Sequence, residues 1–104
     1  MGSKTRVKIT AEIKKTLSKA DVEIFRNVYE EDNDYGDKAG DIFWTVAVHG
    51  RAEDLYYRKW AAQEDAVMMA VDILRNKGIA VAPAVAQLAD SIASWRRKAR
   101  MSDG

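Results

Sequence analysis

The strongest β-strand signal in the chain is Ile42-Phe43-Trp44-Thr45-Val46-Ala47-Val48. Six of these seven residues are β-branched or aromatic, the side chains that strands favour. Gly40 and Asp41 precede the segment and Gly50 follows it, so turn residues bound it on both sides. We therefore expect a β-strand over 42–48 and a sheet at the centre of the fold.

A second strand is predicted over residues 55–60, Leu-Tyr-Tyr-Arg-Lys-Trp. Alternation along this run places Tyr56 and Trp60 on one side and Tyr57 on the other. Residues 49–54 join the two strands and contain a glycine, which predicts a β-hairpin with a short loop. The competing interpretation is a single helix over 51–77. We prefer the hairpin, because a helix of about 27 residues would exceed twice the mean helix length.

The first third of the chain allows two interpretations at each element. Residues 22–29 have the composition of a strand, although Ser18 and Asp21 also suit the start of a helix. We predict a strand, because a two-stranded hairpin alone is marginal in water and a third strand would complete a sheet. For the segment before it, a short helix over 10–17, capped by Thr10, and an edge strand over 6–13 are both open.

Two helices are predicted after the strands. Residues 63–77 carry apolar side chains at helical spacing and end before Gly78, and residues 83–100 begin at Pro83, the only proline. The expected fold class is therefore α+β, with a three- or four-stranded antiparallel sheet packed against two C-terminal helices. A short N-terminal helix is one of the two options for the start of the chain.

Length and composition indicate one globular domain over residues 1–104, with flexible ends at 1–5 and 101–104. Hydrophobic residues make up 47% of the chain and charged residues 32%, which is not the composition of a disordered protein. The chain has no cysteine, and the apolar run 67–71 is far too short to cross a membrane. We expect a cytoplasmic protein that has no membrane partner.

The net charge of +1 conceals a strong separation of charge along the chain. Residues 1–20 carry six basic side chains and one acidic side chain, whereas residues 21–41 carry two basic and eight acidic ones. Residues 95–104 are basic again, with four basic side chains against one acidic. The two ends of the chain are therefore opposite in charge to the segment that precedes the strand 42–48.

Residues 30–41 are expected to form an exposed acidic loop, because polar residues and glycines fill this segment. Carboxylates spaced along a loop imitate the charge of nucleic-acid phosphates, and an aromatic residue among them can anchor a contact. We therefore predict a non-enzymatic regulator or inhibitor that binds a protein partner, such as a nucleic-acid-handling complex. The predicted protein-binding residues are Glu30, Glu31, Asp32, Asp34, Tyr35, Asp37 and Tyr57. In size and character the chain is similar to the small inhibitors that phages direct against host defence systems, including anti-CRISPR proteins.

The predicted element order over residues 10–78 is helix, strand, strand, strand, helix, which resembles the double-stranded-RNA-binding domain, most closely over 42–78. That resemblance implies RNA contacts from the first helix, from a loop between strands and from basic residues at the start of the last helix. Lysines in the first predicted helix suit the first contact. The loop is acidic and the last helix opens with Gln63-Glu64-Asp65, so two of the three contacts carry the wrong charge.

Nucleic-acid binding is the alternative function. It would use the two basic ends of the chain as one joined face that neutralises phosphates. The residues predicted for this face are Lys14, Lys15, Lys19, Arg96, Arg97, Lys98 and Arg100.

Catalysis and metal binding are not predicted. His49 is the only histidine, which excludes a metal site built on a pair of histidines, and no nucleophile is marked near it. The acidic segment 32–37 lacks the residue spacing and the closing glutamate of a calcium loop, and there is no glycine-rich phosphate loop. We expect neither a cofactor nor a metal.

Overall fold

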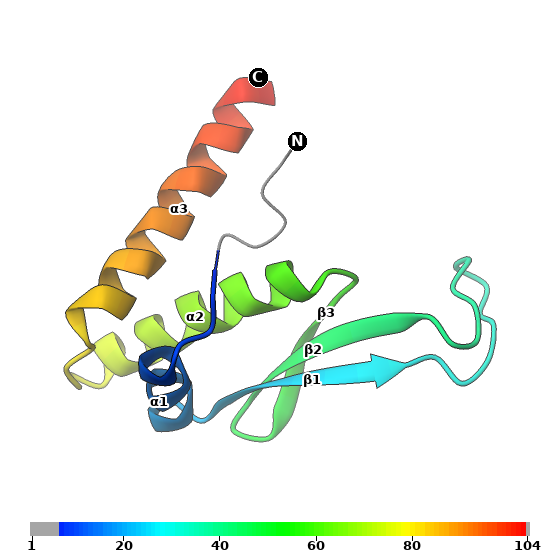
Figure 1. Ribbon diagram of the computed structural model, residues 1–104, viewed down its shortest axis with the longest axis horizontal. Coiled ribbons are helices and arrows are strands. Elements are labelled where there is room, and N and C mark those ends of the chain that lie inside the picture. The colour runs from blue at the N-terminus through cyan, green and yellow to red at the C-terminus, as the bar shows by residue number, and fades with distance from the viewer. Residues whose placement is uncertain (1–6, 104) are drawn as a thin grey trace.

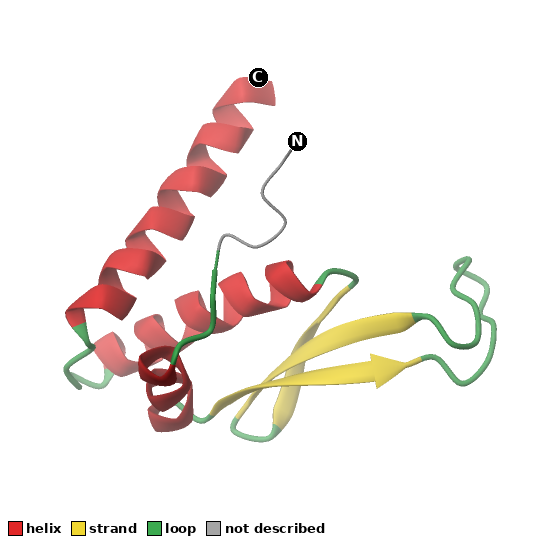
Figure 2. Cartoon of the chain, in the orientation of Figure 1, coloured by secondary structure: helices red, strands yellow, loops and turns green. Residues whose placement is uncertain are grey.

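The computed structural model describes residues 7–103, with side chains up to Arg100. Its elements, in chain order, are α1 (Ala11–Lys19), β1 (Val22–Val28), β2 (Ile42–Val48), β3 (Arg51–Tyr56), α2 (Lys59–Asn76) and α3 (Pro83–Asp103). The strands form one antiparallel sheet in the order β1-β2-β3 (Figure 2). The α+β class is confirmed, with three strands, two C-terminal helices and a short N-terminal helix. The segment 1–5, predicted to be flexible, lies outside the described residues, and the backbone of α3 continues through residue 103.

The segment before the sheet is a helix. The Thr10 hydroxyl oxygen accepts a hydrogen bond from the Ile13 N–H at 3.2 Å, which is an N-cap contact. Ile13 and Leu17 are buried, so α1 packs its apolar side against the core. The alternative edge strand over 6–13 is wrong, because this cap starts the helix at Ala11.

The hairpin between β2 and β3 turns more tightly than predicted. His49 and Gly50 both have positive φ, 52° and 78°, as a two-residue hairpin turn of type I′ requires. Pairing with β2 resumes directly after the turn, so β3 covers 51–56 rather than 55–60. The predicted six-residue loop over 49–54 is therefore wrong.

Helix α2 begins four residues earlier than predicted, at Lys59 rather than residue 63. β3 ends at Tyr56, and the extended backbone of Arg58 forms the N-cap. Trp60, predicted on a strand, lies instead in the first turn of α2. The competing single helix over 51–77 is also wrong, since its first residues pair with β2.

The register of the sheet separates two faces. The strand predicted over 22–29 is present as β1, which ends at Val28 and pairs with β2 along its whole length. One face packs on the helices through side chains that belong to the core or touch it, namely Val22, Ile24, Trp44, Val46, Val48 and Tyr56. Alternation places Phe25, Phe43 and Leu55 on the other face. The buried side chains of α1 and α2 share one cluster with Val22 and Val46 of the first face, and α3 contacts only helices. No described helix therefore covers the second face.

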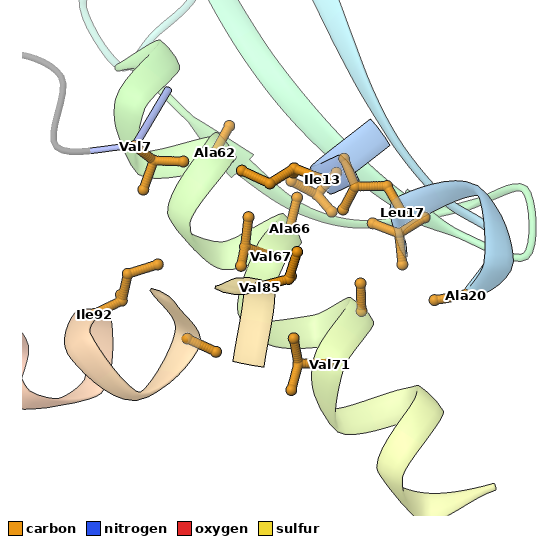
Figure 3. Packing of buried hydrophobic residues seen from close by; sticks show 14 of the residues in the cluster. Val7, Ile13, Leu17, Ala20, Ala62, Ala66, Val67, Val71, Val85 and Ile92 are labelled. Carbon is orange, nitrogen blue, oxygen red and sulfur yellow. The ribbon is translucent and has the colours of Figure 1, made fainter. Parts of the chain in front are cut away.

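The core lies around α2, which is packed between the sheet, α1 and α3 (Figure 1). Ala62, Ala66 and Ala70 of α2 are completely buried, and their small side chains let neighbouring elements approach closely. Figure 3 shows buried side chains of the three helices gathered in one cluster, together with Val7 from the segment before α1. Val7 is 1% exposed, so this segment is part of the core.

The molecule has two projections. It measures 43 × 36 × 22 Å, and its Cα radius of gyration of 15.0 Å exceeds the ~13 Å typical of a compact domain of this length. In Figure 1 the loop between β1 and β2 extends to the right, and the C-terminal half of α3 extends to the top, away from the sheet. Among the described helices, none combines the length and the apolar character needed to cross a membrane.

Candidate functional site

The acidic loop, residues 30–41, lies at the far end of the β1–β2 hairpin and projects past the helices (Figure 1). Two backbone hydrogen bonds close its base. The Tyr29 N–H donates to the Asp41 carbonyl and the Gly40 N–H donates to the Tyr29 carbonyl, both at 2.9 Å. The hairpin pairing thus continues one step beyond the strands and fixes where the loop starts.

Asn33 organises the inside of the acidic loop. Its side-chain oxygen accepts hydrogen bonds from the backbone N–H groups of Tyr35 at 2.8 Å and Asp37 at 3.1 Å. Its Nδ2 donates to Asp37 Oδ2 at 2.9 Å, and its own N–H donates to the Asp37 carbonyl at 3.0 Å. A single asparagine therefore holds the tip of the loop in a defined turn.

The carboxylates of the loop fall into two groups. Asp32 accepts a hydrogen bond from the Ala39 N–H at 2.9 Å, and Asp41 accepts one from the Lys38 N–H at 3.0 Å. These two, with Asp37, hold the loop together. The remaining acids are exposed and make no hydrogen bond or ion pair within the described part of the chain; they are Glu30, Glu31 and Asp34. Of the predicted binding carboxylates, these three are the ones with no hydrogen bond inside the loop, so all their acceptor sites face solvent.

Aromatic side chains connect the loop to the sheet. The rings of Tyr29 and Phe43 lie 4.4 Å apart between centroids, and the Tyr57 hydroxyl lies 3.5 Å from Asp37 Oδ2. Desolvation raises the pKa of Tyr29 from its ordinary 10.0 to about 12, and a hydrogen bond with Tyr57 and the charge of Asp37 act in the same direction. Tyr35, by contrast, is 90% exposed at the tip of the loop. Tyr57 therefore braces the loop, whereas Tyr35 is presented to solvent.

The uncovered face of the sheet continues from the base of the loop. We call Phe25, Phe43, Leu55 and Tyr57 the outer sheet face. Phe25 and Leu55 lie on either side of Thr45 in the register and are 45% and 40% exposed. Only Tyr57 of this group was predicted from the sequence. The alternation of β1 and β2 is the signal that could have found the others, but both faces of these strands carry large apolar side chains.

Arg96 has a structural role, because its guanidinium group is held in an ion-pair network. Its guanidinium group pairs with Asp65 and lies 3.5 Å from Glu64 Oε1, and the Glu64 side chain is 1% exposed. The Tyr56 hydroxyl donates to the other Asp65 oxygen at 2.6 Å. Burial and this hydrogen bond raise the pKa of Tyr56 well above its ordinary value. The network joins α3, α2 and β3, so the charge of Arg96 is already neutralised.

The other predicted basic residues are exposed in two separate groups. One group is on α1 and the other on the last described turns of α3; they are Lys14, Lys15 and Lys19, and Arg97, Lys98 and Arg100. The start of the described chain meets α3 near Val85 and Leu88. The cations of α3 lie about ten residues, or ~15 Å, further along the helix axis. The structure therefore does not bring the two groups together as one face.

The start of α2 is basic, whereas an acidic start was predicted. Arg58 and Lys59 stand at the N-cap and first position of this helix, and both are exposed. The Lys59 ammonium lies 5.4 Å from the centre of the Trp44 ring. The predicted opening Gln63-Glu64-Asp65 falls in the second turn, where Gln63 and Glu64 are buried. Basic side chains therefore occupy the helix start, where the sequence predicts acidic ones.

His49 has a structural role in the β2–β3 turn. Its Nδ1 lies 3.1 Å from Asp21 Oδ2, and both side chains are more than half exposed. Both residues have positive φ, and the His49 N–H donates to the Asp21 carbonyl at 2.9 Å. Within the described residues, no three His, Cys, Asp or Glu side chains are placed to hold a metal ion.

Comparison with known proteins found no protein family, no curated protein and no solved structure that matches the chain.

Proposed function

We propose that this protein is a small non-enzymatic regulator or inhibitor that binds a basic surface of a partner protein through the acidic loop. The observation that carries the proposal is that the loop carboxylates have two different roles. Some of them build the loop, and this leaves Glu30, Glu31 and Asp34 on a braced scaffold with their charges turned to solvent. Lysine and arginine side chains of a partner are the groups that such carboxylates attract.

Order within the loop supports a binding role. A loop that is already held by hydrogen bonds loses less conformational entropy when it binds, so more of the interaction energy appears as affinity. Asn33 provides this order, and Tyr35 beside it offers a large, almost fully exposed aromatic ring. Aromatic rings are frequent anchors of protein interfaces.

The charge pattern also indicates the kind of partner. Carboxylates spaced along a projecting loop resemble the phosphates of a nucleic-acid strand. A protein surface that otherwise binds nucleic acid would therefore attract the loop. Small phage inhibitors of host defence, such as anti-CRISPR proteins, are the class that the chain is similar to in size and character.

The test uses two variants with the same change in net charge and a short oligolysine peptide as the probe. The loop-reversal variant is Glu30→Lys/Glu31→Lys/Asp34→Lys, and its control is Glu12→Lys/Asp72→Lys/Asp90→Lys. At low salt we expect the loop-reversal variant to bind the peptide about tenfold more weakly than wild type, with a much smaller loss in the control. Equal losses in the two variants would contradict the proposal, because the effect would then follow net charge alone.

Double-stranded RNA binding is the second candidate function. The helix-strand-strand-strand-helix order is present from α1 to α2, and Arg58 and Lys59 place cations at the start of α2. RNA-binding domains of this shape require basic residues at that point to contact phosphates. The acidic loop remains unfavourable for such a contact.

Titration with a short RNA duplex separates the two functions. If RNA binding is the function, affinity falls steeply with salt, falls in Arg58→Ala/Lys59→Ala, and rises in the loop-reversal variant. If the loop is a protein-binding site, the wild type has little affinity for the duplex, and Arg58→Ala/Lys59→Ala leaves oligolysine binding unchanged.

A further inference from the structure

We propose that the outer sheet face and the acidic loop form one continuous docking surface. It fits a protein patch that is apolar at its centre and rich in lysine or arginine at its border. This inference rests on the proposed function, since it uses the acidic loop as the charged part of the contact. It adds the apolar part, which supplies most of the free energy in protein association.

Exposed apolar side chains are concentrated around the sheet. Seven large hydrophobic residues are exposed in the described chain, and six of them lie on the strands or the loops beside them: Phe25, Val28, Tyr35, Ile42, Leu55 and Tyr57. The seventh, Ile79, lies between α2 and α3. Of these, Phe25, Leu55 and Tyr57 belong to the outer sheet face, whereas the register places Val28 and Ile42 on the opposite face, beside the base of the acidic loop. Scattered exposed residues are normal on a protein surface, whereas neighbouring ones on one face are typical of an interaction site.

The outer sheet face has a simple geometry. Phe25, Thr45 and Leu55 form one row across the three strands, and Asn27 and Phe43 form the next row. The Asn27 amide donates to the Thr45 hydroxyl at 3.1 Å, so the polar groups at the centre are bonded to each other. A partner that covers the face can leave this hydrogen bond in place.

The outer sheet face is continuous with the acidic loop. The ring of Phe43 contacts Tyr29 at the base of the loop, and Tyr57 reaches Asp37 within it. Side chains of the apolar part thus contact side chains of the loop, and one partner surface can cover both.

Charge decides among the possible occupants of this surface. No outward-facing strand position carries a basic side chain, and Glu23 stands at the end of the face opposite the acidic loop. A second copy of this chain would bring acidic borders together. Nucleic acid would place phosphates against the same carboxylates. A protein with a basic border meets opposite charge at both ends, which is the complementarity that specific interfaces show.

The experiment compares two peptide probes of equal length, one of alternating lysine and leucine and one of lysine alone. We expect wild type to bind the alternating peptide about tenfold more tightly, because only this peptide can cover the apolar side chains. Phe25→Ser/Leu55→Ser removes that preference and leaves the affinity for oligolysine unchanged. Leu55→Ser alone reduces the preference, whereas Ile79→Ser, at 41% exposure against 40% for Leu55, leaves it intact.

Three results would overturn the inference. The first is an unchanged preference for the alternating peptide in the folded double variant and in Leu55→Ser. The second is self-association of wild type, measured by sedimentation, that the double variant abolishes, since a second copy would then occupy the face. The third is binding of oligothymidine that the double variant weakens, which would make the face a base-stacking platform. If the loop-reversal variant instead binds oligolysine as tightly as wild type, the proposed function itself is overturned.

Discussion

Arg96 fastens the C-terminal half of α3 to the start of α2. Its partners are Asp65 and the buried carboxylate of Glu64. Asp65 also accepts a hydrogen bond from the Tyr56 hydroxyl. The Arg96 side chain is 37% exposed, so water screens part of its interaction. An arginine that joins three elements in this way contributes to stability more than to binding.

We expect Arg96→Ala to lower the free energy of unfolding by about 2 kcal/mol, because the buried Glu64 carboxylate loses this cation. Arg97→Ala, which removes an exposed neighbour on the same helix, should change it by less than about 0.5 kcal/mol. Urea unfolding of the two variants beside wild type measures the difference. Equal effects would show that the pairing of Arg96 does not stabilise the fold.

The phenol of Tyr29 should ionise only in strongly alkaline solution. Its pKa is raised on folding from 10.0 to about 12, so the folded protein holds the phenol proton more tightly than the unfolded chain does. The stability that results is complete below pH 10 and is lost as the pH rises through about 12. The ultraviolet absorbance of wild type should include a phenolate step near pH 12, which Tyr29→Phe removes. If the absorbance step that Tyr29→Phe removes lies near pH 10.0 instead, this assignment is contradicted.

At the scale of the elements, the β2–β3 turn sets the positions of both β3 and α2. Gly50 has a φ of 78°, and no atom lies within 4 Å of the position that a Cβ would occupy there. The cost of a side chain at this position is therefore purely conformational.

Gly50→Ala should destabilise the protein by about 1 kcal/mol, because alanine disfavours positive φ. His49→Asn should stay within about 0.5 kcal/mol of wild type, since asparagine tolerates this conformation and the contact with Asp21 is exposed. Thermal unfolding followed by circular dichroism measures both. A neutral Gly50→Ala would mean that the turn relaxes to another type.

The sequence was enough to predict the element order from residue 22 onward, but the segment before it stayed open between a helix and an edge strand. The strand over 22–29 followed from the need to complete a sheet, whereas the later elements carry local signals. β-Branched residues mark 42–48, Thr10 caps the first helix, and Pro83 and Gly78 bound the last two. The boundaries of β3 were missed because Arg51-Ala52-Glu53-Asp54 has little strand propensity. Its pairing comes from the tight turn and from β2, so tertiary structure overrides the local preference here.

The candidate site was predictable in part. The acidic composition of 30–41 identified the loop, but the sequence did not show which carboxylates hydrogen bond within it. The role of Arg96 depends on Glu64 and Asp65, more than thirty residues earlier, which no local pattern reveals. The outer sheet face was missed because Val22 and Ile24 on one side of β1 and Phe25 on the other are all apolar. Only the packing of α2 distinguishes the two sides.

At the scale of the whole molecule, opposite charges occupy two separate projections. The acidic loop extends to the right in Figure 1 and the basic end of α3 to the top. The net charge of +1 is therefore a poor guide to electrostatic behaviour.

We expect wild type to be retained on an anion exchanger at pH 7 and low salt, although its net charge is positive, because the loop presents its carboxylates together. Neutralising the free carboxylates in Glu30→Gln/Glu31→Gln/Asp34→Asn should abolish this retention. The salt concentration at elution is the measurement. Wild type that passes through the anion exchanger unretained would show that the loop does not act as a separate acidic surface.

The burial of Val7 has a consequence for the order of events during synthesis. Val7 belongs to the same core cluster as Val85 and Ile92, which lie at the other end of the sequence. Contacts between distant parts of a chain form late, because they must wait for the residues between them. The core cannot close until α3 has left the ribosome, so the sheet, its turn and the acidic loop are the parts of the molecule that can form first.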